Sequence, residues 1–444
     1  MGVALVCWRT NLIVVVMKSM PVLAAVVYVF SSSLQAESWP QFRGPGATAT
    51  AVEGATIPAE WDAKKNVKWK TDMPGPGSSS PIYWGDQLFV TCYTGYGTNK
   101  EEPGKAKDLG RKLVCLNRSS GDILWTKPLE VGNPEDDYRG YLMEHGYASA
   151  TPVTDGENVY IYCGKSGVFA YSMDGKKVWD SPTGVSSADK KWGSAASPIL
   201  HEDLVIVNAS DEANAIIAFD KASGAERWRY ESDKLPLTYN TPTVHVPESG
   251  KAEIVFSAPE QLFALDPKTG KRLWFAKTAI PGNVCPSVIS AGETLFTSGG
   301  WPRRGSVAIK GGGSGDVTDK ILWTKKTYTY VPTPVLIGKN VHWVSDSGEV
   351  IVMSLATGDV VTKSKVEGLE GRKNMAFYAS IVRVGDKLFA VSRRSGTFVF
   401  EANEGMKQIG KNDLGDKSEF NATPAIAKDA LYLRSNKAVY CIAE

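Results

Sequence analysis

The chain has 444 residues, of which 43% are hydrophobic and 22% charged, a composition typical of a globular protein with a large core. It carries 50 Lys and Arg against 48 Asp and Glu. The net charge of +2 excludes a broad electrostatic field for nucleic acid or for an anionic membrane surface. The 13 Trp, 17 Tyr and 43 Gly favour short strands joined by tight turns over long helices.

Residues 1–36 have the pattern of a secretory signal peptide. A positive flank precedes an apolar run at residues 22–30, and small and polar residues follow up to Ala36. Lys18 and Pro21 interrupt the apolar stretch, which favours cleavage after Ala36 over a permanent membrane anchor. Cleavage would give a periplasmic or secreted protein.

Residues 37–65 are predicted to form an N-terminal arm ahead of the main domain. Its segment "WPQFRGPGATAT" could lie across one face of the fold, with Trp39 and Phe42 as anchors and Arg43 reaching a polar group. A deletion of residues 38–55 would test this arrangement.

A motif of about a dozen residues recurs through residues 66–444. The clearest copy, "ALDPKTGKRLW", ends at Trp274, and weaker copies end at Trp125, Trp179 and Trp228. A small or hydroxyl residue followed by Pro opens an apolar strand in phase with this motif, mostly every 44 to 48 residues. That period is typical of a propeller blade. The landmark prolines are Pro81, Pro152, Pro198, Pro242, Pro286, Pro334 and Pro424, with Ser380 standing in once.

Each repeat reads as four short strands with turns between them, which predicts one antiparallel sheet. Eight units predict an all-β, eight-bladed propeller spanning residues 66–444. The last unit stops after three strands, and "NVKWKTDM" at residues 66–73 could supply its fourth strand. An N-terminal strand in that place would close the ring and leave no open seam.

The motif itself predicts a turn and a packing residue. Asp266 can accept backbone N–H groups and Gly270 supplies the positive φ of the turn. The Trp would fill the widest gap between outer strands, at Trp69, Trp125, Trp179, Trp228, Trp274 and Trp323. Thr362 and Ile409 replace it in two units, where looser packing is expected. The glycine-rich "KGGGSGD" at residues 310–316 is expected to form a hairpin turn.

The repeat resembles the tryptophan-docking motif of the pyrroloquinoline quinone (PQQ)-like propellers. That family includes quinoprotein dehydrogenases and the BamB-type outer-membrane assembly lipoprotein. The segments "SWPQFRGPGATAT" and "YLMEHGYASATPVTDG" are also similar to secreted PQQ-like repeat proteins of planctomycete-type bacteria. The resemblance covers residues 66–444 and is specific for fold, but it is weak for activity.

The loops that lead into the innermost strands are expected to gather at the mouth of the central channel. They bring together aromatic and amide side chains that could stack on a planar ring or a sugar. The alternative is that these side chains pack between blades and plug the channel. The candidate ligand-binding residues are Arg43, His145, Tyr147, Trp192, Tyr239, Asn240, Asn283, Tyr330, Tyr378 and Asn421.

No catalytic residue or metal ligand is predicted. The resemblance to quinoprotein dehydrogenases implies PQQ with Ca²⁺, which would require vicinal cysteines and a carboxylate-rich ligand set. The chain has no Cys-Cys pair, and Glu144 and Glu419 are the nearest carboxylates in the mouth loops. His145 could act as a base, or it could be a hydrogen-bonded structural residue. PQQ with Ca²⁺ is therefore disfavoured and no cofactor is predicted.

The preferred functional prediction is an exported, non-catalytic binding or scaffolding protein for a protein or glycan partner, formed by a monomeric propeller. The alternative is a PQQ-dependent oxidoreductase or a sugar-acting enzyme with its site at the channel mouth.

Overall fold

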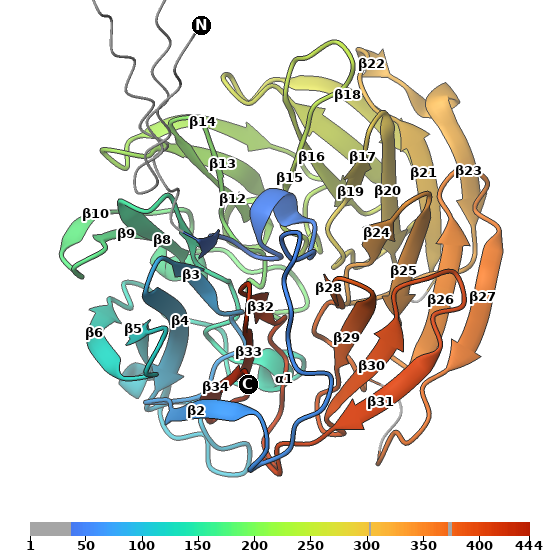
Figure 1. Cartoon of the computed structure of the whole chain (residues 1–444). Helices are drawn as coiled ribbons and strands as arrows, with labels where there is room; N and C mark the ends of the chain where they lie inside the picture. The colour runs from blue at the N-terminus through green and yellow to red at the C-terminus, as the bar shows by residue number, and fades with distance from the viewer. Residues whose placement is uncertain (1–36, 302, 372–374) are drawn as a thin grey trace, which may run out of the picture. The chain divides into compact units, whose positions relative to one another are not determined.

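The computed structural model of the protein describes residues 37–301, 303–371 and 375–444. The account below concerns the compact unit Ser38–Glu444. Eight antiparallel sheets surround a central channel in this unit, as Figure 1 shows from one end of the channel. The predicted eight-bladed, all-β propeller is confirmed. The predicted signal peptide, residues 1–36, lies outside the described residues.

The first four blades follow one another in chain order, each numbered from its innermost strand outward. Blade 1 contains β3 (Ile82–Trp84), β4 (Gln87–Thr94), β5 (Gly110–Asn117) and β6 (Ile123–Leu129). Blade 2 contains β7 (Val153–Thr154), β8 (Asn158–Tyr162), β9 (Val168–Ser172) and β10 (Lys177–Ser181). Blade 3 contains β11 (Ile199–His201), β12 (Leu204–Ala209), β13 (Ala215–Asp220) and β14 (Glu226–Glu231). Blade 4 contains β15 (Thr243–His245), β16 (Glu253–Ala258), β17 (Gln261–Leu265) and β18 (Arg272–Lys277).

The next three blades repeat the pattern and the eighth is completed from the other end of the chain. Blade 5 contains β19 (Ile289–Ala291), β20 (Thr294–Gly299), β21 (Gly305–Lys310) and β23 (Ile321–Lys325). Blade 6 contains β24 (Val335–Ile337), β25 (Asn340–Val344), β26 (Glu349–Ser354) and β27 (Val360–Lys365). Blade 7 contains β28 (Val382–Val384), β29 (Lys387–Val391), β30 (Thr397–Glu401) and β31 (Gln408–Asn412). Blade 8 contains β32 (Ala425–Ile426), β33 (Leu431–Arg434), β34 (Ala438–Ile442) and β2 (Val67–Asp72).

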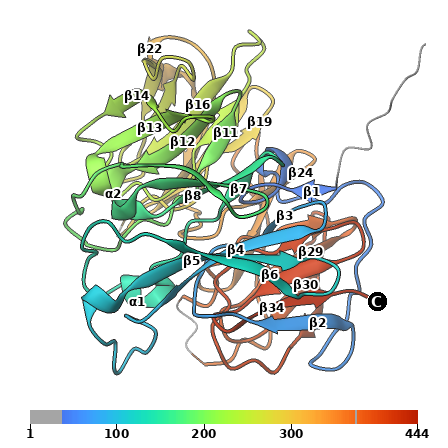
Figure 2. The same cartoon turned by 90° about the vertical axis from the view of Figure 1, so that its left-hand side faces the viewer.

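Strand β2 closes the ring, as the sequence predicts. It pairs antiparallel with β34, from Val67 opposite Ile442 to Asp72 opposite Ala438. Figure 2 shows the two strands side by side near the C-terminus. Because one sheet joins both ends of the propeller, the circle has no open seam.

The helices are short. The α-helices are α1 (Leu142–His145) and α2 (Ser210–Ala213), and the 3₁₀ turns are η1 (Pro45–Ala47), η2 (Ala106–Asp108), η3 (Gly164–Ser166) and η4 (Thr318–Lys320). Across the part of the chain that the structure describes, no helix combines the length and apolar character needed to cross a membrane. A long insertion connects β6 of blade 1 to β7 of blade 2. Helix α1 belongs to this insertion and lies beside the channel (Figure 1).

The outer rim is held by tryptophans that stack on the next blade. A side-chain methyl group at Gly270 would lie 2.5 Å from the Trp228 ring of the preceding blade, and the Trp228 indole Nε1–H donates to the Pro267 carbonyl at 2.7 Å. Gly270 has a φ of 67°. The turn glycine is therefore needed twice, for its backbone conformation and for the close approach of the indole. Trp69, Trp125, Trp179 and Trp323 approach Gly121, Gly175, Gly224 and Gly358 in the same way.

Three blades lack this contact. Trp274 faces a blade whose outer turn is replaced by a longer segment, and its Nε1–H donates instead to Glu253 at 2.9 Å. Ile409 neighbours blade 8, where the chain ends leave no turn between β34 and β2. The Thr362 hydroxyl donates to the Glu404 carbonyl at 2.6 Å in place of an indole.

The glycine-rich segment at residues 310–316 differs from the expected hairpin turn. Part of it forms β22 (Gly315–Asp316), which pairs in parallel with β18 on the outer edge of the preceding blade. The segment thus ties blade 5 to blade 4 at the place where Trp274 lacks a docking turn.

A ring of hydroxyl residues, rather than the prolines, marks the inner end of every blade. Each lies two residues before the innermost strand: Ser80, Thr151, Ser197, Thr241, Ser287, Thr333, Ser380 and Thr423. Seven of these residues donate their backbone N–H to the hydroxyl oxygen of the equivalent residue in the next blade, at 2.9 to 3.0 Å. Pro286 precedes its hydroxyl residue, whereas the other six landmark prolines follow theirs. The predicted landmark is therefore out of register in blade 5, and also in blade 7, where Ser380 is itself the hydroxyl residue and does not replace a proline.

The N-terminal arm crosses one end of the channel. Strand β1 (Ser38–Trp39) pairs with β3, the Thr154 N–H donates to the Pro40 carbonyl at 2.9 Å, and Thr50 bridges to Arg383 of blade 7. The Arg43 guanidinium donates to the Thr333 and Pro334 carbonyls at 2.8 and 2.6 Å. The arm therefore joins blades from opposite sides of the ring.

The five described cysteines are free thiols. In the register between β4 and β5, Cys92 lies opposite Lys112 and Cys115 opposite Phe89. Cys92 and Cys115 therefore lie on neighbouring strands without facing each other.

Candidate functional site: the channel cavity

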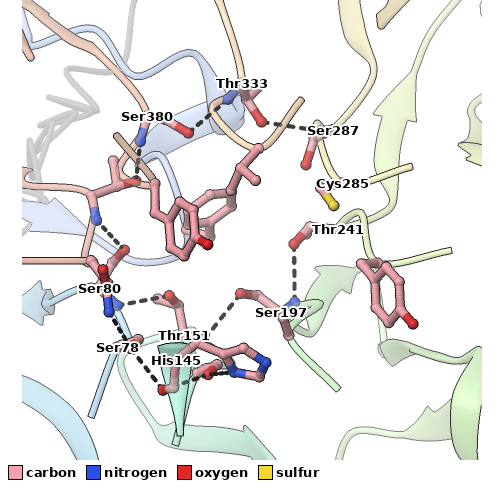
Figure 3. A pocket seen from close by; sticks show the side chains of 18 of the residues that line it. Ser78, Ser80, His145, Thr151, Ser197, Thr241, Cys285, Ser287, Thr333 and Ser380 are labelled. Atoms are coloured by element: carbon pink, nitrogen blue, oxygen red, sulfur yellow. Dashed lines mark hydrogen bonds between the residues drawn. The ribbon is translucent and has the colours of Figure 1, made fainter. Parts of the chain in front are cut away.

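A cavity of about 170 Å³ occupies the channel. All eight ring hydroxyls line it, together with five aromatic side chains of the mouth loops, Tyr141, Trp192, Tyr239, Tyr330 and Tyr378. Figure 3 shows the labelled hydroxyl side chains around one common opening. Phe42 of the arm also contacts the cavity, which the arm bounds at the end away from the mouth loops.

Three of the aromatic residues, Tyr141, Trp192 and Tyr239, form the continuous part of a collar along one side of the mouth. The Tyr141 and Trp192 ring centroids lie 4.4 Å apart, and Trp192 and Tyr239 lie 5.9 Å apart. Tyr330 continues outward to Trp301, at 6.1 Å. Aromatic faces at this spacing offer a stacking surface for a ring-shaped ligand.

His145 lines the cavity as a neutral, fully hydrogen-bonded imidazole. Its Nε2 lies 2.9 Å from the Trp192 carbonyl, and its Nδ1 lies 2.6 Å from the Ser149 hydroxyl. A carbonyl can only accept, so Nε2 carries the proton and Nδ1 accepts from Ser149. Burial lowers the pKa of His145 to about 4. Both ring nitrogens are therefore engaged, which favours the structural alternative over a catalytic base.

The hydroxyl ring is interrupted beside Cys285. Among the described residues, no N–H to hydroxyl bond joins Thr241 to Ser287, and Figure 3 places the Cys285 thiol between these two side chains. Burial raises the pKa of the Cys285 thiol to about 12, with a smaller contribution from the charge of Asp346. The thiol is therefore protonated at neutral pH and is a weak nucleophile.

Arg393, Glu144, Glu419 and Lys100 form one ion-pair network beside the mouth. The Arg393 Nη2 contacts Glu144 at 2.6 Å and Glu419 at 2.7 Å, and its Nε donates to the Asn421 carbonyl oxygen at 2.9 Å. The guanidinium lies 4.2 Å over the Tyr378 ring. Lys100 adds a second cation at 3.4 Å from Glu419. This network braces the loops of blades 1, 7 and 8 and places none of these charges in the cavity lining. The carboxylate of Asp346, whose charge acts on Cys285 and Tyr330, lies outside this network, and one of its oxygens has no hydrogen-bond partner within the described structure.

The structure brings together six of the ten candidate residues predicted from sequence. The cavity-lining members are His145, Trp192, Tyr239, Tyr330, Tyr378 and Asn421. Asn240 is fully buried and donates to the Ser257 carbonyl. Asn283 donates to the Tyr330 hydroxyl at 3.2 Å and so supports a lining residue.

The other two candidates lie elsewhere. Tyr147 packs against Tyr93 and Tyr96 beneath the long insertion and donates to the Asp136 carbonyl at 2.8 Å. Arg43 lies in the arm, and its side-chain nitrogens donate hydrogen bonds to backbone carbonyls.

Sequence reasoning missed Tyr141, Cys285, Arg393 and the hydroxyl ring. The hydroxyl ring was predictable from the sequence, because a Ser or Thr precedes the innermost strand of every repeat. Arg393 has no comparable signal in the sequence, because it follows the second strand of blade 7 and does not lie in a loop before an innermost strand.

Comparison with known proteins places the chain in a family. The family model described as "Outer membrane protein assembly factor BamB" matches residues 69–208 and 110–364. These matches together cover more than half of the chain, which therefore belongs to this family of PQQ-like repeat propellers.

Individual relatives come from two functional groups. The outer membrane protein assembly factor BamB of Burkholderia pseudomallei is 25% identical over 295 residues, 57% of this chain and 73% of that protein. BamB of Shewanella oneidensis is 20% identical and is covered over 64% of its length. The quinohemoprotein alcohol dehydrogenase ADH IIB of Pseudomonas putida is 29% identical over 160 residues, and the match spans only 22% of that enzyme.

Solved structures share the fold. BamB from Moraxella catarrhalis superposes with a TM-score of 0.57 at 13% identity, over 84% of this chain and 96% of its own. The quinohemoprotein alcohol dehydrogenase from Comamonas testosteroni gives a TM-score of 0.59 at 10% identity, over 93% of this chain and 81% of its own. At these identities the likeness shows the fold alone. The similarity to secreted planctomycete-type members stays a prediction.

The cavity lining does not fit PQQ. This cofactor carries three carboxylates, and burying anions requires cations or several charge-assisted donors. The cavity is lined by hydroxyl, aromatic, amide, imidazole, thiol and small apolar groups, without Arg or Lys. Arg393, which stacks on the lining residue Tyr378, is already neutralised by two carboxylates. Within the described residues, no three His, Cys, Asp or Glu side chains are grouped to hold a metal ion.

Proposed function

We propose that the protein is an exported, non-catalytic binding protein that holds the end of a neutral glycan at the channel mouth. It would act in the periplasm or outside the cell after removal of residues 1–36, as a single propeller. The observation that carries this proposal is the lining of the channel cavity, which combines an aromatic collar with a ring of hydroxyls and no charged side chain.

The state of the reactive groups supports binding rather than chemistry. General acid–base catalysis needs a group whose pKa lies near the working pH and which can reach a substrate proton. His145 is held neutral with both nitrogens engaged, and Cys285 is held as a thiol. Glu144 and Glu419 are bound to Arg393.

A ligand panel tests the proposal. The unfolding temperature of the purified protein should increase as neutral oligosaccharide is added and then level off, because a ligand that binds only the folded state stabilises that state. PQQ with Ca²⁺ should leave the unfolding temperature unchanged. Micromolar, saturable binding of PQQ with Ca²⁺, coupled to alcohol-dependent reduction of a dye, would establish the oxidoreductase alternative instead.

A protein partner is the second candidate, and the family match favours it. Relatives named as outer membrane protein assembly factors align over most of the propeller. A scaffold of this kind would use the faces of the disc and the long insertion of blade 1. Substitutions inside the cavity would then leave partner binding unchanged, which separates the two candidates.

A further inference from the structure

We infer that the channel cavity receives a single uncharged pyranose ring, the terminal residue of the glycan, and that Trp301 carries the residue that follows it. This inference rests on the proposed function and names the part of the ligand that enters the protein. Four features of the site lead to it: its size, its charge, its hydrogen-bonding groups and its rim.

The size of the cavity limits the ligand to one ring. An engineered protein cavity of about 150 Å³ holds one benzene molecule, whereas drug-sized ligands occupy clefts of about 300 to 1,000 Å³. The present cavity has about 170 Å³. One six-membered ring therefore fits and a disaccharide must extend out of the mouth.

The charge of the lining excludes an acidic sugar. No Arg, Lys, Asp or Glu side chain lines the cavity, and the nearby Arg393 is bound by Glu144 and Glu419. A carboxylate group brought into this space would lose its hydration without a cation to pair with it. The occupant is therefore a neutral sugar and not a uronic acid.

The hydrogen-bonding groups point to a ligand rich in oxygen. Seven ring hydroxyls already accept a backbone N–H from the neighbouring blade. Each hydroxyl keeps its own hydrogen, which is free to donate into the cavity. The Tyr378 hydroxyl is buried and has no partner within the described structure. The ring and hydroxyl oxygens of a sugar can accept these hydrogens, and its C–H faces can pack on the aromatic collar.

Trp301 extends the site beyond the cavity. Its indole is 48% exposed and lies 6.1 Å from the lining residue Tyr330. The Arg304 guanidinium stacks on it at 4.3 Å, and a backbone bridge to Gly282 holds its position. An exposed indole fixed beside the mouth is a platform for the second sugar residue.

Calorimetric titration of the full protein with methyl hexopyranosides tests the inference. The neutral gluco, galacto and manno glycosides and the matching methyl glucuronide are the probes. At least one neutral glycoside should bind, and its uronide should bind about tenfold more weakly or not at all, because the carboxylate meets no cation. A disaccharide glycoside should bind about fivefold more tightly than its monosaccharide, and Trp301→Ala should remove that advantage.

Matched variants locate the binding in the cavity. Tyr378→Phe removes only a hydroxyl and keeps the ring over Arg393, and it should weaken binding about fivefold. Tyr171→Phe is the control, because its hydroxyl donates to the Pro128 carbonyl far from the channel, and its affinity should equal that of the unmodified protein. Cys285→Phe, which fills the cavity, should abolish binding.

The outcomes separate the inference from the proposed function. If neutral glycosides bind and Tyr378→Phe and Cys285→Phe change nothing, the inference is wrong, but a glycan-binding protein remains. If neutral glycans of any length fail to bind, both are wrong. Binding of phenol without any glycoside would identify an aromatic ligand and would also overturn the inference.

Discussion

The rim and the axis of the propeller use repetition in opposite ways. At the rim, tryptophans such as Trp228 stack on the turn glycine of the next blade, and the repeated side chain is itself the contact. At the axis, the repeated hydroxyls bind backbone N–H groups, and the side chains that define the cavity, such as Trp192 and Cys285, differ from blade to blade. The repeat thus builds the frame, and the departures from it shape the site.

Removing a rim tryptophan should have the largest effect. Trp228→Ala deletes a side chain that is only 7% exposed, together with its hydrogen bond to Pro267. Loss of a buried aromatic residue should lower the free energy of unfolding by about 4 kcal/mol. Chemical denaturation measures this change. Trp301→Ala, which removes an exposed tryptophan at the mouth, is the control and should cost less than about 1 kcal/mol. Equal losses would mean that rim stacking does not stabilise the ring.

A methyl group at the turn glycine should also break the rim. Gly270→Ala places a side chain at positive φ and 2.5 Å from the Trp228 ring, and it should cost about 3 kcal/mol. Gly292→Ala has a similar φ of 56° with no atom within 4 Å and should cost about 1 kcal/mol. The difference between the two denaturation midpoints isolates the tryptophan contact. Matching midpoints would show that only the backbone conformation requires glycine.

At the axis, His145 should make the free energy of unfolding decrease as the pH is lowered. Its pKa is about 4 in the folded protein and 6.5 in the unfolded chain, so unfolding takes up a proton between these values. The free energy of unfolding should drop by about 2 kcal/mol from pH 6.5 to pH 5 through this group. Burial also lowers the pKa of His245 and His342, so these residues add to the trend. In His145→Gln the drop should be smaller by that amount, and an unchanged pH profile would contradict the neutral imidazole.

The smallest effect is expected for Tyr378→Phe. The comparison is between a hydroxyl that we assign to ligand binding and the Tyr171 hydroxyl, which stabilises the fold. Tyr378→Phe removes a buried hydroxyl without a partner and should leave the unfolding free energy unchanged or raise it slightly. Tyr171→Phe removes a hydroxyl bonded to Pro128 at 2.8 Å and should cost about 1 kcal/mol. Denaturation curves of the two variants, recorded together, decide this. A larger loss for Tyr378→Phe would show that its hydroxyl serves the fold.

The repeated part of the molecule was predictable from the sequence, because every copy of the repeat forms the same strands and turns. The turn around Gly270, the eight blades and the closing strand β2 follow from patterns that recur within the chain. The fifth repeat was misaligned because Pro286 is visible in a sequence, whereas the hydrogen bond of the Ser287 N–H to Thr333 is not.

The site was only partly predictable, because its neighbours come from distant parts of the chain. Trp192, Tyr239 and Tyr330 could be located through their place before an inner strand. The ion pair between Arg393 and Glu144 joins residues 249 positions apart, and no local sequence pattern predicts it. The burial of Asn240 could not be read from its loop either, because it depends on the packing of neighbouring segments.

Hydrogen–deuterium exchange with and without a neutral oligosaccharide tests the central claim most directly. If the channel mouth holds the ligand, exchange should slow in the segments that carry the cavity lining, residues 141–149, 192–197 and 330–333, and should not change in the outer strands. Protection confined to the outer strands or to the insertion at residues 95–108, with no change in the lining segments, would contradict the account.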